Sequence, residues 1–123
     1  MAREITQTLS FSVRKGNDSA SIAISSLKSD WTGVNRGDFM QTVSHTAHEA
    51  LEFPGDVSTA GQCIVRNMDD TNAVKVGLQV GGNFEAIAEI PPADFAKIPL
   101  ATLSVFAKAV TAPVRIRVIV LEK

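Results

Sequence analysis

The stretch Ala73–Ile90 reads AVKVGLQVGGNFEAIAEI and decides the fold class of this chain. Apolar residues occupy every second position from Val74 to Val80 and again from Phe84 to Ile90, with mostly polar or small residues between them. A period of two places successive side chains on opposite faces of a β-strand. The turn formers Gly81-Gly82-Asn83 separate the two runs, so the stretch predicts a β-hairpin.

The same alternation continues on both sides of this hairpin. Downstream it reaches Glu122, with a turn at Thr111-Ala112-Pro113 before the last strand. Upstream, a strand over 4–15, a turn at Gly16-Asn17-Asp18 and a second alternating run to about Leu27 predict another hairpin. A buried strand is expected over 63–68, and residues 29–36, which contain Trp31, are expected to form a loop.

Two segments are harder to interpret. Residues 39–53 fit both a helical spacing and a period of two, and the β-tolerant residues around Thr42 and Val43 favour a strand. Residues 90–99 are bounded by Pro91-Pro92 and Pro99, and are too short for a packed crossover helix. We interpret them as a connection with one helical turn at most, which carries the chain from one sheet to the other.

The length of 123 residues corresponds to one domain, and the pattern gives about seven or eight antiparallel strands. We therefore expect a single all-β domain over 1–123, a β-sandwich of jelly-roll type. An up-and-down β-barrel is the second choice. Residues 1–10 are the candidate for an N-terminal arm or an edge strand that pairs with a neighbour.

Composition excludes several classes of function. Twelve basic and thirteen acidic residues give a net charge of −1, with no run of like charge that would indicate binding to nucleic acid or to a membrane. No apolar run approaches the roughly 20 residues of a membrane span, and the first residues lack the apolar core of a signal peptide. We expect synthesis in the cytoplasm. Cys63 is the single cysteine and is expected to be a buried small apolar residue.

No motif in the chain predicts catalysis, a cofactor or a metal. His45, His48 and Glu49 have metal-ligand side chains, but on a strand the two histidines point to opposite faces, and the His-Glu-x-x-His spacing is absent. Asp69 and its neighbours Asp70 and Asn72 lack the spacing of a calcium loop and are expected to support a turn.

Three residues are candidates for an interface. Arg115 and Arg117 share a face of the last strand, which is either a solvated face with cross-strand ion pairs or a stripe toward a charged partner. Glu85 and Glu89 lie on a comparable face of an earlier strand. Trp31, in its loop, is either a core residue or a protein contact.

The second half of the chain resembles a known class of proteins. The segments that carry the resemblance are 64–77 (IVRNMDDTNAVKVG), 81–84 (GGNF), 90–92 (IPP), 103–109 (LSVFAKA) and 112–116 (APVRI). They are similar to the small β-sandwich structural proteins of tailed-phage virions, a group that includes capsid cement or decoration proteins.

That resemblance implies a non-enzymatic virion protein, made in the host cytoplasm, that lies on the capsid surface and bridges subunits of the major capsid protein as a homo-oligomer. Two other functions remain open from the sequence. One is a tail or tail-fibre component with a receptor-binding loop around Trp31. The other is a small metal-binding or ligand-binding β-barrel that uses His45, His48 and Glu49.

Overall fold

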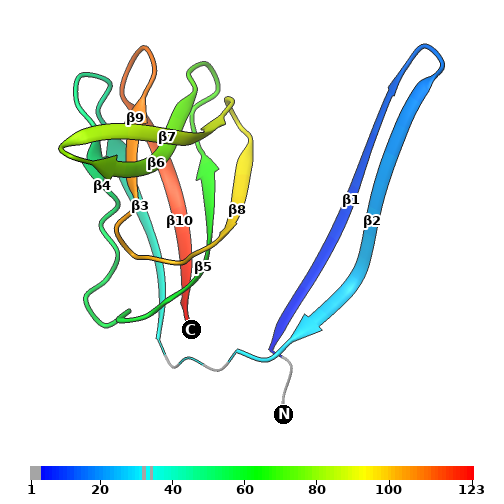
Figure 1. The fold of residues 1–123 in the computed structure, drawn as a ribbon, viewed down its shortest axis with the longest axis horizontal. Coiled ribbons are helices and arrows are strands. Elements are labelled where there is room, and N and C mark those ends of the chain that lie inside the picture. Colours follow the sequence, from blue (N-terminus) through cyan, green and yellow to red (C-terminus); the bar gives the residue numbers. More distant parts are fainter. Residues whose placement is uncertain (1–3, 32, 34) are drawn as a thin grey trace. The chain divides into compact units, whose positions relative to one another are not determined.

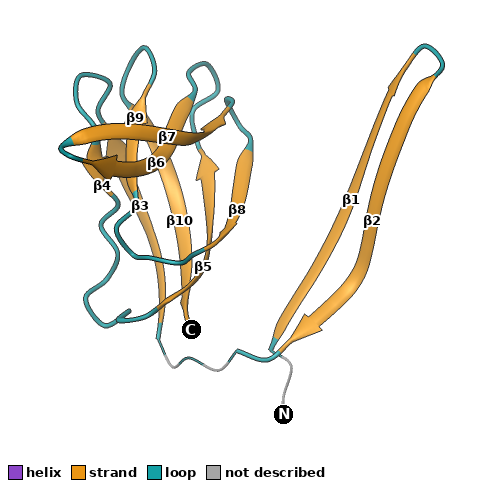
Figure 2. Ribbon diagram, viewed as in Figure 1, coloured by secondary structure: helices purple, strands orange, loops and turns teal. Residues whose placement is uncertain are grey.

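The computed structural model describes residues 4–31, 33 and 35–123, and every regular element in them is a strand (Figure 2). The predicted all-β class is therefore confirmed. The described residues contain no helix that could span a membrane. Contacts within the chain divide it into two compact units, Met1–Thr32 and Gly33–Lys123. We expected one sandwich over 1–123, whereas the sandwich occupies the second unit and the first unit is a hairpin.

The hairpin of the first unit consists of β1 (Ile5–Lys15) and β2 (Asp18–Ser29), paired antiparallel in a two-stranded sheet (Figure 1). The hairpin that the sequence predicted over the first 27 residues is thus present, and Gly16 adopts a positive φ of 60° in its turn. The proposed arm or edge strand over 1–10 is, from Ile5 onward, part of β1.

The second unit contains eight strands in two four-stranded antiparallel sheets, which lie as two layers in Figure 1. We call the sheet with the order β3-β10-β5-β8 the β10 sheet, and the sheet with the order β4-β9-β6-β7 the β6 sheet. The strands are β3 (Arg36–Val43), β4 (Glu49–Ala50), β5 (Ala60–Asn67), β6 (Val74–Val80), β7 (Asn83–Ile90), β8 (Phe95–Pro99), β9 (Phe106–Ala109) and β10 (Val114–Glu122).

This strand order is that of a jelly roll. The pairs β3·β10, β4·β9, β5·β8 and β6·β7 form one long antiparallel hairpin, and the pairs β5·β10 and β6·β9 close it into two sheets. Its tip is the turn at Gly81 and Gly82, where φ values of 57° and 83° match the left-handed conformation that a two-residue hairpin turn requires. The predicted jelly-roll sandwich is confirmed. The alternative of an up-and-down barrel is wrong, because the strands form two open sheets.

Two segments differ from their expected form. Residues 39–53 are strand only up to Val43, since the chain bends over 45–47 before the short β4. The connection over 90–99 does pass from the β6 sheet to the β10 sheet, but instead of a helical turn it contains β8. Because β8 is an edge strand with Pro99 at its end, proline does not interrupt the ladder there.

The core lies between the two sheets and follows the predicted alternation. In β10 every second residue is buried, from Val114 to Glu122, and the intervening residues face outward. Cys63 is 1% exposed, which confirms the expected burial. The apolar residues that form the core are Val43, Leu51, Val57, Cys63, Val65, Val74, Val76, Ile90, Val105, Ala107, Ala109, Val114, Ile116, Val118 and Val120.

Candidate interaction surface

The outer face of the β10 sheet gathers basic residues from all four of its strands. Register places Arg117 of β10 between Met40 of β3 and Arg66 of β5, and Arg66 lies beside Phe95 of β8. We call this outer face the basic face. Its side chains come from Arg36, Asp38, Met40, Thr42, Gln62, Ile64, Arg66, Phe95, Lys97, Arg115, Arg117, Ile119 and Leu121.

The charge of the basic face is strongly unbalanced. Arg36, Arg66, Lys97, Arg115 and Arg117 are all exposed on it, and Asp38 is the one acidic residue among the described side chains of this face. The whole chain carries a net charge of −1, so the positive charge here results from the arrangement of the strands and not from composition. A surface of this kind attracts an acidic partner over about one Debye length.

Arg117 and Asp38 form a bidentate salt bridge on this face. The Nε of Arg117 donates to Oδ1 of Asp38 at 3.0 Å, and its Nη2 donates to Oδ2 at 2.8 Å. These hydrogen bonds lower the pKa of Asp38 and raise the pKa of Arg117, and the charge of Arg36 lowers the Asp38 pKa further. The other four basic residues of the face make no salt bridge with a described residue.

Large apolar side chains stand among these charges. Phe95 is 60% exposed, and Met40 and Ile64 are each 42% exposed. Arginine, methionine and aromatic residues are the types that protein interfaces favour, and apolar side chains gain free energy when a partner removes them from water. The basic face therefore combines charge for orientation with apolar area for affinity.

The structure brings two of the three predicted interface residues together. Arg115 and Arg117 are both exposed on the basic face, with Arg117 paired to Asp38 and not to Glu85 or Glu89, which belong to the β6 sheet. Trp31 belongs to the first unit, where its backbone N–H donates to the Glu4 carboxylate at 3.2 Å.

Sequence reasoning missed the other residues of the basic face. Arg36, Arg66 and Lys97 are each about thirty residues apart in the chain, and only the register of β3, β5 and β8 beside β10 makes them neighbours. Each of these residues occupies a polar position in an alternating segment, which predicts that its side chain lies on the outer face of a sheet. The alternation does not predict which strands lie side by side in that sheet.

The candidate metal ligands His48 and Glu49 contact different residues. The His48 ring stacks on Phe84 with centroids 5.5 Å apart and meets Phe106 edge-on at 5.7 Å. The Glu49 carboxylate accepts from the Gln41 side chain at 3.3 Å. Among the described residues, no group of three His, Cys, Asp or Glu side chains is arranged to hold a metal ion.

The acidic loop after β5 has the turn chemistry that its sequence predicted. The Asp69 carboxylate accepts from the backbone N–H groups of Thr71 at 2.7 Å and Asn72 at 2.8 Å. These two bonds lower the pKa of Asp69. The aspartate therefore serves to order the loop.

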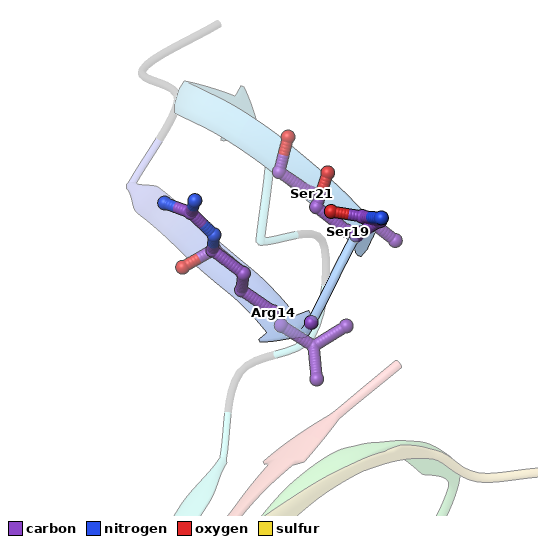
Figure 3. Close-up of a pocket in the computed structure, with 8 residues that line it drawn as sticks. Arg14, Ser19 and Ser21 are labelled. Atoms are coloured by element: carbon purple, nitrogen blue, oxygen red, sulfur yellow. The ribbon is translucent and has the colours of Figure 1, made fainter.

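A shallow hollow lies near the tip of the β1–β2 hairpin (Figure 3). Arg14 faces Ser19 across the two strands, and the neighbouring pair on the same face is Ser12 and Ser21. A two-stranded ribbon has no second wall, so these polar side chains do not enclose a ligand.

Comparison with known proteins adds no identification. No protein-family model, no curated protein and no solved structure matches this chain.

Proposed function

We propose that this chain is a non-enzymatic structural protein of a tailed-phage virion, a cement protein that binds the major capsid protein through the basic face. The observation that carries the proposal is the group of five basic side chains around Met40, Ile64 and Phe95 on the outer face of one sheet. The jelly-roll fold and the resemblance of residues 64–116 to virion β-sandwich proteins support the placement on a capsid.

The chemistry of the basic face specifies the partner surface. Its unpaired arginines match a surface with carboxylates, and its apolar side chains match exposed apolar area at the same site. On a lattice of identical subunits each such contact can be weak, because many copies bridging neighbouring subunits act together.

A protein surface fits the basic face better than nucleic acid does. Ile64 and Ile119 are neighbours at the centre of the sheet, and Phe95 flanks Arg66. A phosphate backbone laid across this face would place charge over apolar side chains, which favours neither group. We therefore assign the face to a protein partner.

The test is co-sedimentation of the purified protein with expanded, undecorated capsids. Arg66→Gln with Arg115→Gln removes two charges from the basic face, and we expect the affinity to fall by about tenfold or more. Lys75→Gln with Lys108→Gln is the matched control, because these neighbouring lysines lie on the outer face of the β6 sheet and their loss changes the net charge equally. The control variant should bind like the unmodified protein, and added salt should weaken binding.

Equal binding by both double variants would show that the basic face is not the contact. Binding to isolated tails, to host cells or to DNA in place of capsids would overturn the capsid role.

A further inference from the structure

The β1–β2 hairpin has one apolar face and one polar face. Cross-strand pairs on the apolar face join Leu9 to Ile24, Phe11 to Ile22 and Val13 to Ala20. The opposite face carries mainly polar residues, as in the pair of Ser12 and Ser21, and Arg14 lies opposite Ser19 there. We call the first of these faces the apolar hairpin face.

An irregularity in β2 extends the apolar hairpin face. The register shifts between Gln7 and Leu9, and Ser26 adopts a positive φ of 52° with its N–H bonded to the Thr8 hydroxyl at 3.3 Å. One additional residue of β2 is accommodated there, as in a β-bulge. Leu27 consequently lies opposite Gln7, on the same face as Ile24.

The apolar hairpin face is exposed along its length. Phe11 and Ile22, which lie opposite each other, are each 58% exposed, and Val13 is 52% exposed. Leu9, Ile24 and Leu27 are 40–49% exposed. A two-stranded hairpin is marginally stable in water unless another layer covers its apolar side. A partner for this face would therefore stabilise the hairpin itself.

Charge restricts what that partner can be. Neither the segment from Ile5 to Val13 nor the segment from Ser19 to Leu27 contains a charged residue. An acidic or basic surface placed here would lose its hydration and find no opposite charge. The complementary surface is therefore uncharged and apolar, and a second copy of the same face meets that requirement. With a net charge of −1 per chain, repulsion between copies is weak.

We propose that the apolar hairpin face is a self-association surface, on which hairpins of two copies pack face to face. The product is a small two-layer β-sandwich with its sheets about 10 Å apart. This inference does not rest on the proposed role in a virion.

The size of the face sets the strength of this contact. Eleven residues of β1 span about 36 Å at roughly 3.3 Å per residue, and two strands with their side chains are about 10 Å wide. Two such faces bury about 700 Å², which is less than the roughly 1,200 Å² of a stable, specific interface. We expect weak dimers of free chains, with a dissociation constant on the order of 0.01–1 mM, that strengthen where copies are held close together.

Sedimentation velocity of the full chain over this concentration range is the first test. Phe11→Thr with Ile22→Thr keeps β-forming residues but removes the apolar pair, and this variant should remain monomeric. Ser12→Thr with Ser21→Thr introduces the same residues on the opposite face of the hairpin and should associate like the unmodified chain. A monomer at every concentration, or equal association of both variants, would refute the proposal.

If the variant with Phe11→Thr and Ile22→Thr does not form the hairpin, a second measurement still tests the proposal. Ile22→Cys and Ser21→Cys each place one thiol on β2, on opposite faces, while Cys63 stays buried in both variants. With oxidised glutathione as the oxidant, the Ile22→Cys variant should form an interchain disulfide at least tenfold faster than the Ser21→Cys variant. Equal rates would mean that the apolar hairpin face does not meet its copy.

Discussion

The side-chain amide of Asn67 donates a hydrogen bond to the backbone carbonyl of Ile90 at 3.1 Å, and so ties the end of β5 in one sheet to the end of β7 in the other. The same amide reaches the carbonyls of Asn72 at 2.8 Å and Pro91 at 3.1 Å, while its oxygen accepts from the Asp69 N–H at 2.9 Å. Asn67 is fully buried. Its side chain therefore fixes the loop after β5 against the crossover to β8, together with the backbone N–H of Ala93, which donates to the Asp69 carbonyl at 2.9 Å.

Replacement of Asn67 by alanine should lower the free energy of unfolding by about 1–3 kcal/mol, because buried carbonyls and an N–H lose their partner. Urea unfolding followed by circular dichroism measures this change. Asn83→Ala, at an exposed position, is the control and should change stability little. Similar losses in the two variants would contradict the role assigned to Asn67.

Gln41 joins the sheets at the opposite edge, where its Nε2 donates to the Ala50 carbonyl at 3.0 Å and to Glu49 at 3.3 Å. Gln41→Glu should lower the free energy of unfolding by about 1–3 kcal/mol at neutral pH, since a donor is lost and two carboxylates face each other.

The pH dependence of this variant identifies the cause. Repulsion raises the pKa of the paired carboxyls in the folded state, so the folded variant binds protons more tightly than the unfolded chain. Its deficit should shrink as pH falls through that raised pKa. Asn83→Asp makes the same change from amide to carboxylate at an exposed position and is the control. A deficit that stays constant from neutral pH to pH about 4 would argue against repulsion with Glu49.

Arg117→Gln should raise the pKa of Asp38 toward its ordinary value of 3.8, because the two hydrogen bonds that lower it are removed. In the unmodified protein the folded-state pKa is depressed, so the ion pair stabilises the fold above the unfolded pKa, and this contribution is lost as pH falls through the folded pKa. Carbon-13 NMR titration of the Asp38 carboxyl measures the shift. Arg115→Gln, on the same strand and face, should leave this titration unchanged.

The thiol of Cys63 should be unreactive toward Ellman's reagent in the folded protein at pH 8. Burial raises its pKa to about 11, so little thiolate forms and reagent does not reach it. The neutral thiol favours the folded state below the unfolded pKa of about 8.5, and this stabilisation is lost as pH rises from there toward the folded value. Urea should expose the thiol. Thr42→Cys, on the outer face of the same sheet, should react at once, and rapid reaction of Cys63 without urea would contradict its burial.

Local pattern predicted most of this fold because strand period and turn chemistry are read from adjacent residues. The β6–β7 hairpin follows from alternation around Gly81 and Gly82. The alternation did not predict the shift in its ladder, where Val76 pairs with Ala88 and Gly77 pairs with Ala86. β8 was missed because its prolines are typical of a connection, and an edge strand accommodates them.

The basic face could not be predicted in the same way. Arg66 becomes a neighbour of Arg117 through pairing between residues 51 positions apart, and no local pattern encodes that register. The apolar face of the first hairpin was predicted, but its exposure was not, because alternation indicates which side chains share a face and does not indicate what covers them.

The jelly-roll topology of the sandwich affects the order in which the two units can fold. β10 is the last strand of the sandwich in sequence, yet it lies between β3 and β5 in the finished sheet. The β10 sheet consequently lacks a central strand until the ribosome has released that segment, whereas the β1–β2 hairpin needs only local contacts and can close early. During synthesis the β1–β2 hairpin can therefore form before any sandwich exists.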